Sequence, residues 1–232
     1  MSANMHIFEN ASALAEALAD DVGARLAAAI AARGTASLAV SGGSTPKAFF
    51  QSLSRREIDW PKVTVTLVDE RFVPPENERS NHRLVADNLL KHRAAEARFV
   101  PLYYAAETVP AAAAIASQKT ADLGAPLDVV VLGMGTDGHT ASFFPGGSRL
   151  GEALDPATPR GVITMEAEGA GEPRLTFTFS SLQDAGYLVL HIEGSSKKEV
   201  LAQAEAPGAE AEMPIRAMLR RAASPLQIYW AP

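Results

Sequence analysis

Short apolar runs alternate with longer amphipathic segments along most of this chain. Runs rich in β-branched residues predict strands, and apolar residues that recur every three or four positions predict helices. We expect strands at residues 6–8, 37–40, 63–68, 99–102 and 128–132, and helices at 11–32, 46–53, 81–90 and 107–123. Ser80 is expected to cap the third of these helices, and the charged segment 69–71, DER, is expected to be either a solvated turn or a site. The regular alternation of strand and helix is typical of a doubly wound α/β sheet that is mostly parallel.

The pattern changes after Gly147. A loop is expected at 148–160, followed by two strands at 162–165 and 174–179 that form a hairpin and add antiparallel strands to the sheet in the C-terminal third. A strand at 187–192, a helix ending near 204, a loop at 207–214, a helix at 215–221 and a strand at 226–230 complete the chain. No linker or repeat divides it, so residues 1–232 are expected to form a single domain.

The segment 128–147, DVVVLGMGTDGHTASFFPGG, contains the strongest candidate chemistry. Its apolar first part predicts a strand buried on both faces, and ligands of open α/β sheets bind beyond the carboxyl ends of such strands. Asp137 and His139 follow that strand, and one residue separates them. A carboxylate next to an imidazole fixes its tautomer and raises its basicity, which suits general acid–base catalysis. The alternative is a glycine-rich turn with a capping aspartate and a surface histidine.

The same segment contains a dinucleotide-binding pattern, G-x-G-x-x-G, at Gly133, Gly135 and Gly138. The helix that should follow would reach Pro145 after two turns, and no clear second strand ends in an acidic residue about twenty positions later. We therefore regard this fingerprint as weak.

Two further segments predict an anion site. In SGGSTP, at 41–46, Thr45 is expected to cap a helix that begins at Pro46, which leaves backbone N–H groups free for an anion or an oxyanion. Ser195 or Ser196 is expected to cap a later helix with Lys197 in its first turn, where a cation is unfavourable unless an anion binds. The alternatives are a capped turn without a ligand and a pair of solvent-facing lysines.

Composition limits the functions that the chain can have. With 47% apolar and 21% charged residues, its composition is that of a soluble globular protein, and the absence of cysteine excludes disulfides and thiolate metal sites. No signal peptide or transmembrane span is evident, so we expect a cytoplasmic protein. The net charge of −6 disfavours nucleic-acid binding, and the scattered histidines do not predict a metal site.

Five segments together resemble the 6-phosphogluconolactonase family: SGGSTP, VTLVDERFVPPENERSNHRL, LGMGTDGHTASFFPG, PRLTFT and HIEGSSKKEVL, in the family's order from Ser41 to Leu201. The resemblance implies a modified Rossmann-like α/β fold similar to that of glucosamine-6-phosphate deaminases. It implies hydrolysis of 6-phospho-D-glucono-1,5-lactone to 6-phosphogluconate, the second step of the oxidative pentose phosphate pathway, without a cofactor.

The resemblance also implies residue roles. His139 corresponds to the catalytic base and Asp137 to its acidic partner, and the expected substrate-binding residues are Gly42, Gly43, Ser44, Asp69, Arg71, Arg174 and Lys197. Arg160 or Arg149 could replace Arg174, and the role of loop 166–171 stays open. The partner is a sugar-phosphate lactone, without nucleic acid or membrane, and the chain is expected to be a monomer or a weak homodimer. Two alternatives are an amino-sugar-phosphate deaminase–isomerase with Asp69 as an additional base, and a non-catalytic sugar-phosphate sensor.

Overall fold

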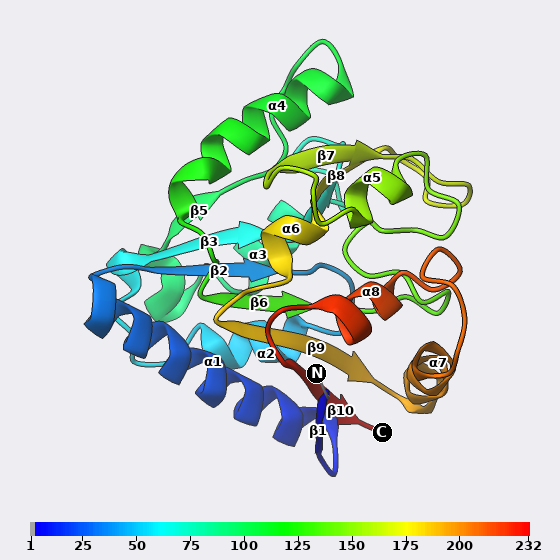
Figure 1. Cartoon of the computed structure of the whole chain (residues 1–232). Helices are drawn as coiled ribbons and strands as arrows, with labels where there is room; N and C mark the ends of the chain where they lie inside the picture. Colours follow the sequence, from blue (N-terminus) through cyan, green and yellow to red (C-terminus); the bar gives the residue numbers. More distant parts are fainter. Residues whose placement is uncertain (1–2) are drawn as a thin grey trace.

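The computed structural model describes residues 3–232 and contains a large parallel sheet with helices on both faces and a small separate sheet (Figure 1). All neighbouring strands of the large sheet are parallel. Its seven strands are arranged in the order β1 (Asn4–Ile7), β10 (Leu226–Ala231), β9 (Tyr187–Glu193), β6 (Val129–Leu132), β2 (Ala36–Val40), β3 (Val63–Leu67) and β5 (Arg98–Val100). This arrangement confirms the predicted mostly parallel α/β fold.

Helices exclude water from both faces of the sheet, which is why β2 and β6 are buried along their whole length and are apolar except at Ser37. In Figure 1, α1 (Ala11–Arg33) and α2 (Lys47–Leu53) lie on one side of the sheet and α4 (Val109–Thr120) lies on the other. Helix α1 begins at the Asn10 cap and ends at Gly34, whose φ is 83°. The remaining helices are α3 (Asn81–Asn88), α5 (Leu150–Leu154), α6 (Phe179–Leu182), α7 (Ser195–Glu205), α8 (Ile215–Arg221) and the short 3₁₀ turns Trp60–Lys62, His92–Glu96 and Ala121–Leu123.

The sequence predicted that the antiparallel strands would extend the large sheet. They form a second sheet instead. In this sheet β8 (Arg174–Phe177) lies between β7 (Val162–Met165) and β4 (Asp69–Arg71), and both pairings are antiparallel. The expected 162–165/174–179 hairpin is therefore present, but it recruits the charged segment that follows β3. That segment is a strand and not a solvated turn. The antiparallel strands are therefore not all in the C-terminal third of the chain.

Several predicted helix boundaries were wrong. Pro46, not Thr45, is the N-cap of α2, and Gly194 precedes α7, so neither Ser195 nor Ser196 caps it. The predicted strand 174–179 stops at Phe177 because α6 begins at Phe179, and α5 lies within the predicted loop 148–160. The Ser80 cap is confirmed, since its hydroxyl accepts a hydrogen bond from the Arg83 N–H at 3.3 Å. Within the described residues, no helix combines the length and apolarity needed to cross a lipid bilayer.

A buried carboxylate joins β4 to the start of α3. The side chain of Glu70 has no solvent exposure, and burial raises its pKa. Its Oε1 accepts hydrogen bonds from the N–H groups of Arg71 at 2.7 Å and Asn81 at 2.8 Å. Its Oε2 accepts from the Ser80 hydroxyl at 2.9 Å and the His82 N–H at 2.8 Å. Both oxygens are thus fully used, and the carboxylate fixes β4 against the N-terminus of α3.

Glu70→Gln should destabilise the fold. The amide NH₂ would face backbone N–H donors in either orientation, and hydrogen bonds to a charged group each contribute about 1.5–3 kcal/mol. We expect a lower thermal midpoint and a free energy of unfolding reduced by at least about 1.5 kcal/mol, measured by urea denaturation. The control is Glu57→Gln, which removes an exposed ion pair with Arg93 and should have little effect. Equal midpoints for the two variants would show that Glu70 does not have this role.

Candidate active site

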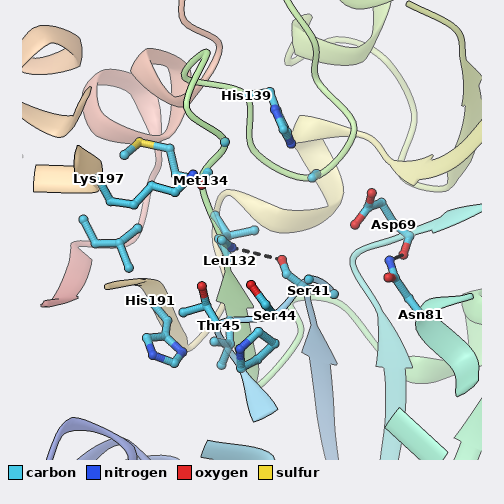
Figure 2. A pocket seen from close by; sticks show the side chains of 18 of the residues that line it. Ser41, Ser44, Thr45, Asp69, Asn81, Leu132, Met134, His139, His191 and Lys197 are labelled. Atoms are coloured by element: carbon cyan, nitrogen blue, oxygen red, sulfur yellow. Dashed lines mark hydrogen bonds between the residues drawn. The ribbon is translucent and has the colours of Figure 1, made fainter. Parts of the chain in front are cut away.

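A pocket lies at the carboxyl ends of the parallel strands, where β2 and β6 are neighbours. The chain passes from β2 to β3 on one side and later returns to β6 on the other, so the pocket lies where the strand order reverses, the usual ligand position in such sheets. Figure 2 shows His139, Lys197 and Asp69 on different sides of this space, with Ser41, Ser44 and Thr45 below them. The lining residues come from 41–46, 131–141 and 191–197, together with Phe50, Asp69, Arg71 and Asn81.

Asp137 and His139 form the pair that the sequence predicted. The Asp137 Oδ1 lies 2.6 Å from His139 Nδ1 and also accepts the His139 backbone N–H at 3.1 Å. The imidazole lines the pocket and is 31% exposed, whereas Asp137 does not line it and is 49% exposed. Because the carboxylate engages Nδ1, the other ring nitrogen of His139 is the one available to a water molecule or ligand.

The charge of Asp137 is stabilised by its partner. Burial by itself would raise the pKa of this carboxyl, but the hydrogen bonds and the positive charge of His139 outweigh it and lower the pKa to about 2. Asp137 is therefore ionised at every pH at which the protein is expected to work. Since its pKa is lower in the folded than in the unfolded chain, its ionised form favours folding above about pH 4, and this contribution is lost as the pH falls through about 2.

Two glycines of the G-x-G-x-x-G pattern, Gly135 and Gly138, are required by the packing of this loop. A Cβ on Gly135 would overlap the His139 ring and the Asp137 carboxylate, so only glycine lets the pair pack against the backbone. Gly138 has a φ of 78°, and a Cβ there would contact the side chain of Met213. The loop thus has its glycines for reasons other than a dinucleotide, in agreement with the weak weight given to that fingerprint.

Lys197 enters the pocket from the first turn of α7. Its Nζ donates a hydrogen bond of 2.7 Å to the carbonyl of Met134, on the loop that carries His139 (Figure 2). Burial lowers the pKa of this ammonium, and the negative charge of Asp137 partly offsets the shift. Lys197 is therefore half-buried, and among residues 3–232 no carboxylate contacts its ammonium; binding of an anion there stays a prediction.

The turn after β2 forms the floor of the pocket. No protein acceptor within residues 3–232 receives the backbone N–H groups of Gly42, Gly43, Ser44 or Thr45. Gly43 has a φ of 97°, and a Cβ on Gly42 would overlap the side-chain amide of Asn81. The unpaired N–H groups that the sequence predicted are present, although Thr45 does not cap the helix, and anion binding by this turn stays a prediction.

The opposite wall consists of alternate residues of β4. Because successive side chains of a strand point to opposite faces, Asp69 and Arg71 line the pocket while Glu70 is buried behind them. Asp69 is 8% exposed, and its Oδ2 accepts a hydrogen bond of 2.5 Å from the Ser142 hydroxyl. Arg71 donates to the carbonyl of Arg79.

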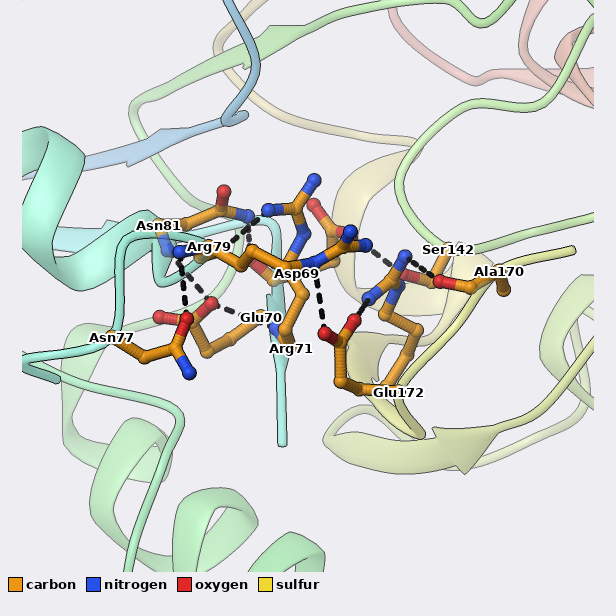
Figure 3. A network of polar contacts seen from close by, with 10 residues as sticks. Asp69, Glu70, Arg71, Asn77, Arg79, Asn81, Ser142, Ala170 and Glu172 are labelled. Carbon is orange, nitrogen blue, oxygen red and sulfur yellow. Dashed lines mark hydrogen bonds and ion pairs between the residues drawn. The ribbon is translucent and has the colours of Figure 1, made fainter. Parts of the chain in front are cut away.

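Three residues of this site were missed from the sequence. Asn81 donates a 2.9 Å hydrogen bond to the carbonyl of Asp69, and Ser142 bonds the Asp69 carboxylate (Figures 2 and 3). His191, which the sequence assigned to an unrelated segment, lines the same pocket as His139 and lies 3.0 Å from Glu193. Asn81 had one signal, the polar ERSNHRL run that follows β4, but nothing local indicated contacts of Ser142 and His191 with residues far along the chain.

Arg174 does not line the pocket, unlike the other expected substrate-binding residues. It is 5% exposed, and its guanidinium donates to the carbonyl of Ala170 at 2.6 Å. The two alternative arginines are also elsewhere: Arg149 pairs with Glu152, and Arg160 pairs with Asp184. None of the three therefore lies where a pocket ligand would contact it directly.

Metal binding has no support from side-chain grouping. Across residues 3–232, no three side chains of histidine, aspartate or glutamate come together in a way that could hold a metal ion. The metal-free expectation stays a prediction, which activity after exhaustive chelation would test.

Comparison with known proteins gives a consistent result. A family model described as "Glucosamine-6-phosphate isomerases/6-phosphogluconolactonase" matches residues 9–230. The chain is 92% identical, over the full length of both proteins, to a protein of Rhizobium meliloti (strain 1021) named 6-phosphogluconolactonase. A 6-phosphogluconolactonase of Mesorhizobium japonicum is 54% identical over 100% of this chain and 96% of that protein.

Solved structures agree with these matches. The crystal structure of a 6-phosphogluconolactonase from Shewanella baltica has a TM-score of 0.96 and 38% identity, covering 100% of this chain and 98% of that one. A monomeric glucosamine-6-phosphate deaminase has a TM-score of 0.79 at 17% identity, covering 98% and 97% of the two chains, which shows a shared fold alone.

Gly135→Ala should displace the Asp137–His139 pair and change the titration of Asp137. Without the hydrogen bonds of His139, the effect of burial dominates, so the Asp137 pKa should rise from about 2 toward or above the ordinary 3.8. NMR titration of the aspartate carboxyl carbons measures this. Gly151→Ala is the control, because a Cβ there meets no neighbouring atom. An unchanged Asp137 pKa in Gly135→Ala would refute the packing role of Gly135.

Proposed function

The chain belongs to the family of glucosamine-6-phosphate isomerases and 6-phosphogluconolactonases, and we propose that its pocket hydrolyses 6-phosphogluconolactone with His139 as the general base on water. The reaction converts 6-phospho-D-glucono-1,5-lactone to 6-phospho-D-gluconate, and the lactonase relatives at up to 92% identity support it. The residue assignment rests on the contact between Asp137 and His139. The Asp137 carboxylate engages Nδ1 of the imidazole, so the other ring nitrogen is available to take the proton.

The base step needs a neutral imidazole. His139 takes a proton from a water molecule, whose oxygen attacks the lactone carbonyl carbon C1. The C1–ring oxygen bond then breaks, and the imidazolium returns the proton to the departing ring oxygen, which becomes a hydroxyl. Ionised Asp137 favours this cycle because its negative charge stabilises the imidazolium that forms in between.

The tetrahedral intermediate carries a negative charge on the former carbonyl oxygen. We assign the N–H groups of Gly42 and Gly43 as its donors, because they line the pocket and have no acceptor in the part of the protein that the structure describes. One such donor typically contributes on the order of 10²–10³-fold in rate. Ser44 belongs to the same turn and completes the cradle.

The 6-phosphate needs cations within a chain of net charge −6. We assign Arg71 and Lys197 to it, because both line the pocket and the Lys197 ammonium lacks a contacting carboxylate. Asp69, fixed by Ser142, is assigned to the sugar hydroxyls, which a carboxylate oxygen can accept. The deaminase–isomerase alternative shares the family model and the fold, but the relatives at 92% and 54% identity are named as lactonases.

The remaining properties follow from the substrate and the topology. The terminal strands β1 and β10 are neighbours in one sheet, which supports a single domain over 1–232. We propose that the chain acts as a monomer or weak homodimer, without nucleic acid, in the cytoplasm, where phosphate charge retains sugar phosphates. Light scattering after size-exclusion chromatography tests the oligomeric state.

His139→Ala should abolish most lactonase activity without changing the fold or substrate affinity. General-base catalysis typically contributes about 10²–10⁴-fold, so kcat should fall by about that factor. The measurement is acid release from freshly prepared 6-phosphogluconolactone, corrected for spontaneous opening. His92→Asn, at an exposed histidine with a φ of 51°, is the control. A His139→Ala protein that retains more than about a tenth of wild-type turnover would exclude His139 as the base.

Arg71→Ala and Lys197→Ala should weaken recognition of the phosphate. Each loss of about 1.5–3 kcal/mol corresponds to a roughly tenfold to hundredfold lower kcat/KM for the phosphorylated lactone, mainly through KM. Unphosphorylated gluconolactone should be a poor substrate that neither variant makes much worse. Lys198→Ala is the control, because Lys198 follows Lys197 in the chain but its ammonium lies over the Trp230 ring and does not line the pocket. Equal losses on both lactones would mean that these cations stabilise the protein instead.

A further inference from the structure

Arg174 is a buried cation that the proposed chemistry leaves without a role. Removing a guanidinium from water is costly unless its donors are satisfied. Here one donor engages the Ala170 carbonyl at 2.6 Å, and another lies 3.5 Å from a carboxylate oxygen of Glu172. Such a group is fixed in place, and it does not line the pocket where the substrate is expected.

The guanidinium of Arg174 lies over an aromatic ring. The Arg174 Cζ lies 5.6 Å from the centroid of the Phe144 ring, within the distance of a cation–π contact. The centroid of the Phe144 ring in turn lies 4.5 Å from that of the His139 imidazole, with the two rings tilted by 45°. Arg174, Phe144 and His139 therefore form a continuous series of contacts, called the stack below, that ends at the proposed base.

The outer end of this stack is held by loop 166–173. Ala170 supplies the carbonyl acceptor, and Glu172 is itself bound by Arg79 Nε at 2.8 Å (Figure 3). The Arg174 backbone is equally constrained, because it pairs with Arg71 on one side and Met165 on the other in the small sheet. Both the main chain and the side chain of Arg174 are therefore rigid, which a support for a mobile residue requires.

His139 needs such a support. It lies on a glycine-rich loop, is 31% exposed, and within residues 3–232 its ring has one hydrogen bond, to Asp137. That bond fixes the tautomer, and the backbone of Gly135 packs against the ring. Phe144, which is 9% exposed, adds an aromatic contact that further limits where the ring can lie. A displacement of about 1 Å of a catalytic group can cost on the order of 10²-fold in rate.

We propose that Arg174 is a positioning residue: it holds Phe144 against His139, and loop 166–173 acts on catalysis through it. This role rests on the proposed function and replaces direct contact of Arg174 with the phosphate. It also gives loop 166–173 a function, because the Ala170 carbonyl and Glu172 set the position of the guanidinium.

The test compares Arg174→Met, Phe144→Leu and the double variant on phosphorylated and unphosphorylated gluconolactone. We expect each single variant to lower kcat about tenfold to hundredfold on both lactones, with KM for the phosphorylated lactone changed less than about threefold. The double variant should be no slower than the slower single variant, because both changes remove the same stack. Arg149→Met, which removes a surface arginine paired with Glu152, should match the wild type.

Three outcomes would overturn the proposal. A tenfold or larger rise in KM confined to the phosphorylated lactone would make Arg174 a phosphate ligand. Multiplicative losses in the double variant would show that Arg174 and Phe144 act independently. If Arg174→Met fails to fold, Phe144→Leu carries the test alone, and wild-type kcat in that variant overturns the role of the stack.

The two levels of inference fail differently. A wild-type protein that does not accelerate opening of 6-phosphogluconolactone would refute the proposed function and, with it, the role of Arg174. If the wild-type protein accelerates the reaction, a KM rise confined to the phosphorylated lactone or multiplicative losses in the double variant would refute only the positioning role.

Discussion

The buried carboxylate of Glu70 is the interaction on which the geometry of the pocket depends. It accepts hydrogen bonds from two separate chain segments, the β4 strand and the first turn of α3, and so joins them. Successive side chains of β4 point to opposite faces, so burial of Glu70 on one face directs Asp69 and Arg71 toward the pocket on the other. The same bond to the Asn81 N–H brings the side chain of Asn81 over Gly42. One buried charge thus aligns two walls of the site.

Close approach of side chains to glycine backbone shapes the rest. Asn81 packs on Gly42, and the Asp137–His139 pair packs on Gly135, in both cases where a Cβ would overlap. These contacts let polar groups from loops lie against the ends of β2 and β6 instead of standing away from them. At these two points the main chain has no side chain, so Asn81 and His139 line the pocket directly against the backbone.

Electrostatics explains why so acidic a chain can bind an anionic substrate. Most of its surface arginines are paired with carboxylates, as Arg149 and Arg160 are. Lys197 instead donates to a carbonyl, and Arg71 does the same, so their charges are not cancelled by contact. Arg174 is the contrasting case, since its guanidinium donates into the protein, to the Ala170 carbonyl and toward Glu172.

The sequence by itself determined the features that depend on neighbours along the chain. The apolar runs of β2 and β6, the period of α1 and the Ser80 cap were predicted because burial and capping leave a local pattern. The one-residue spacing of Asp137 and His139 likewise ensured that they could meet.

Only the tertiary structure decided the features that join distant segments. β4 is too short and charged to be recognised as a strand, and it exists because β8, about a hundred residues later, supplies its hydrogen bonds. The direction of the Arg174 side chain was equally undetermined, because its choice between pocket and interior depends on Ala170, Glu172 and Phe144 together. A sequence shows which residues alternate along a strand, but the face that each side chain occupies is set by the partners that pack against it.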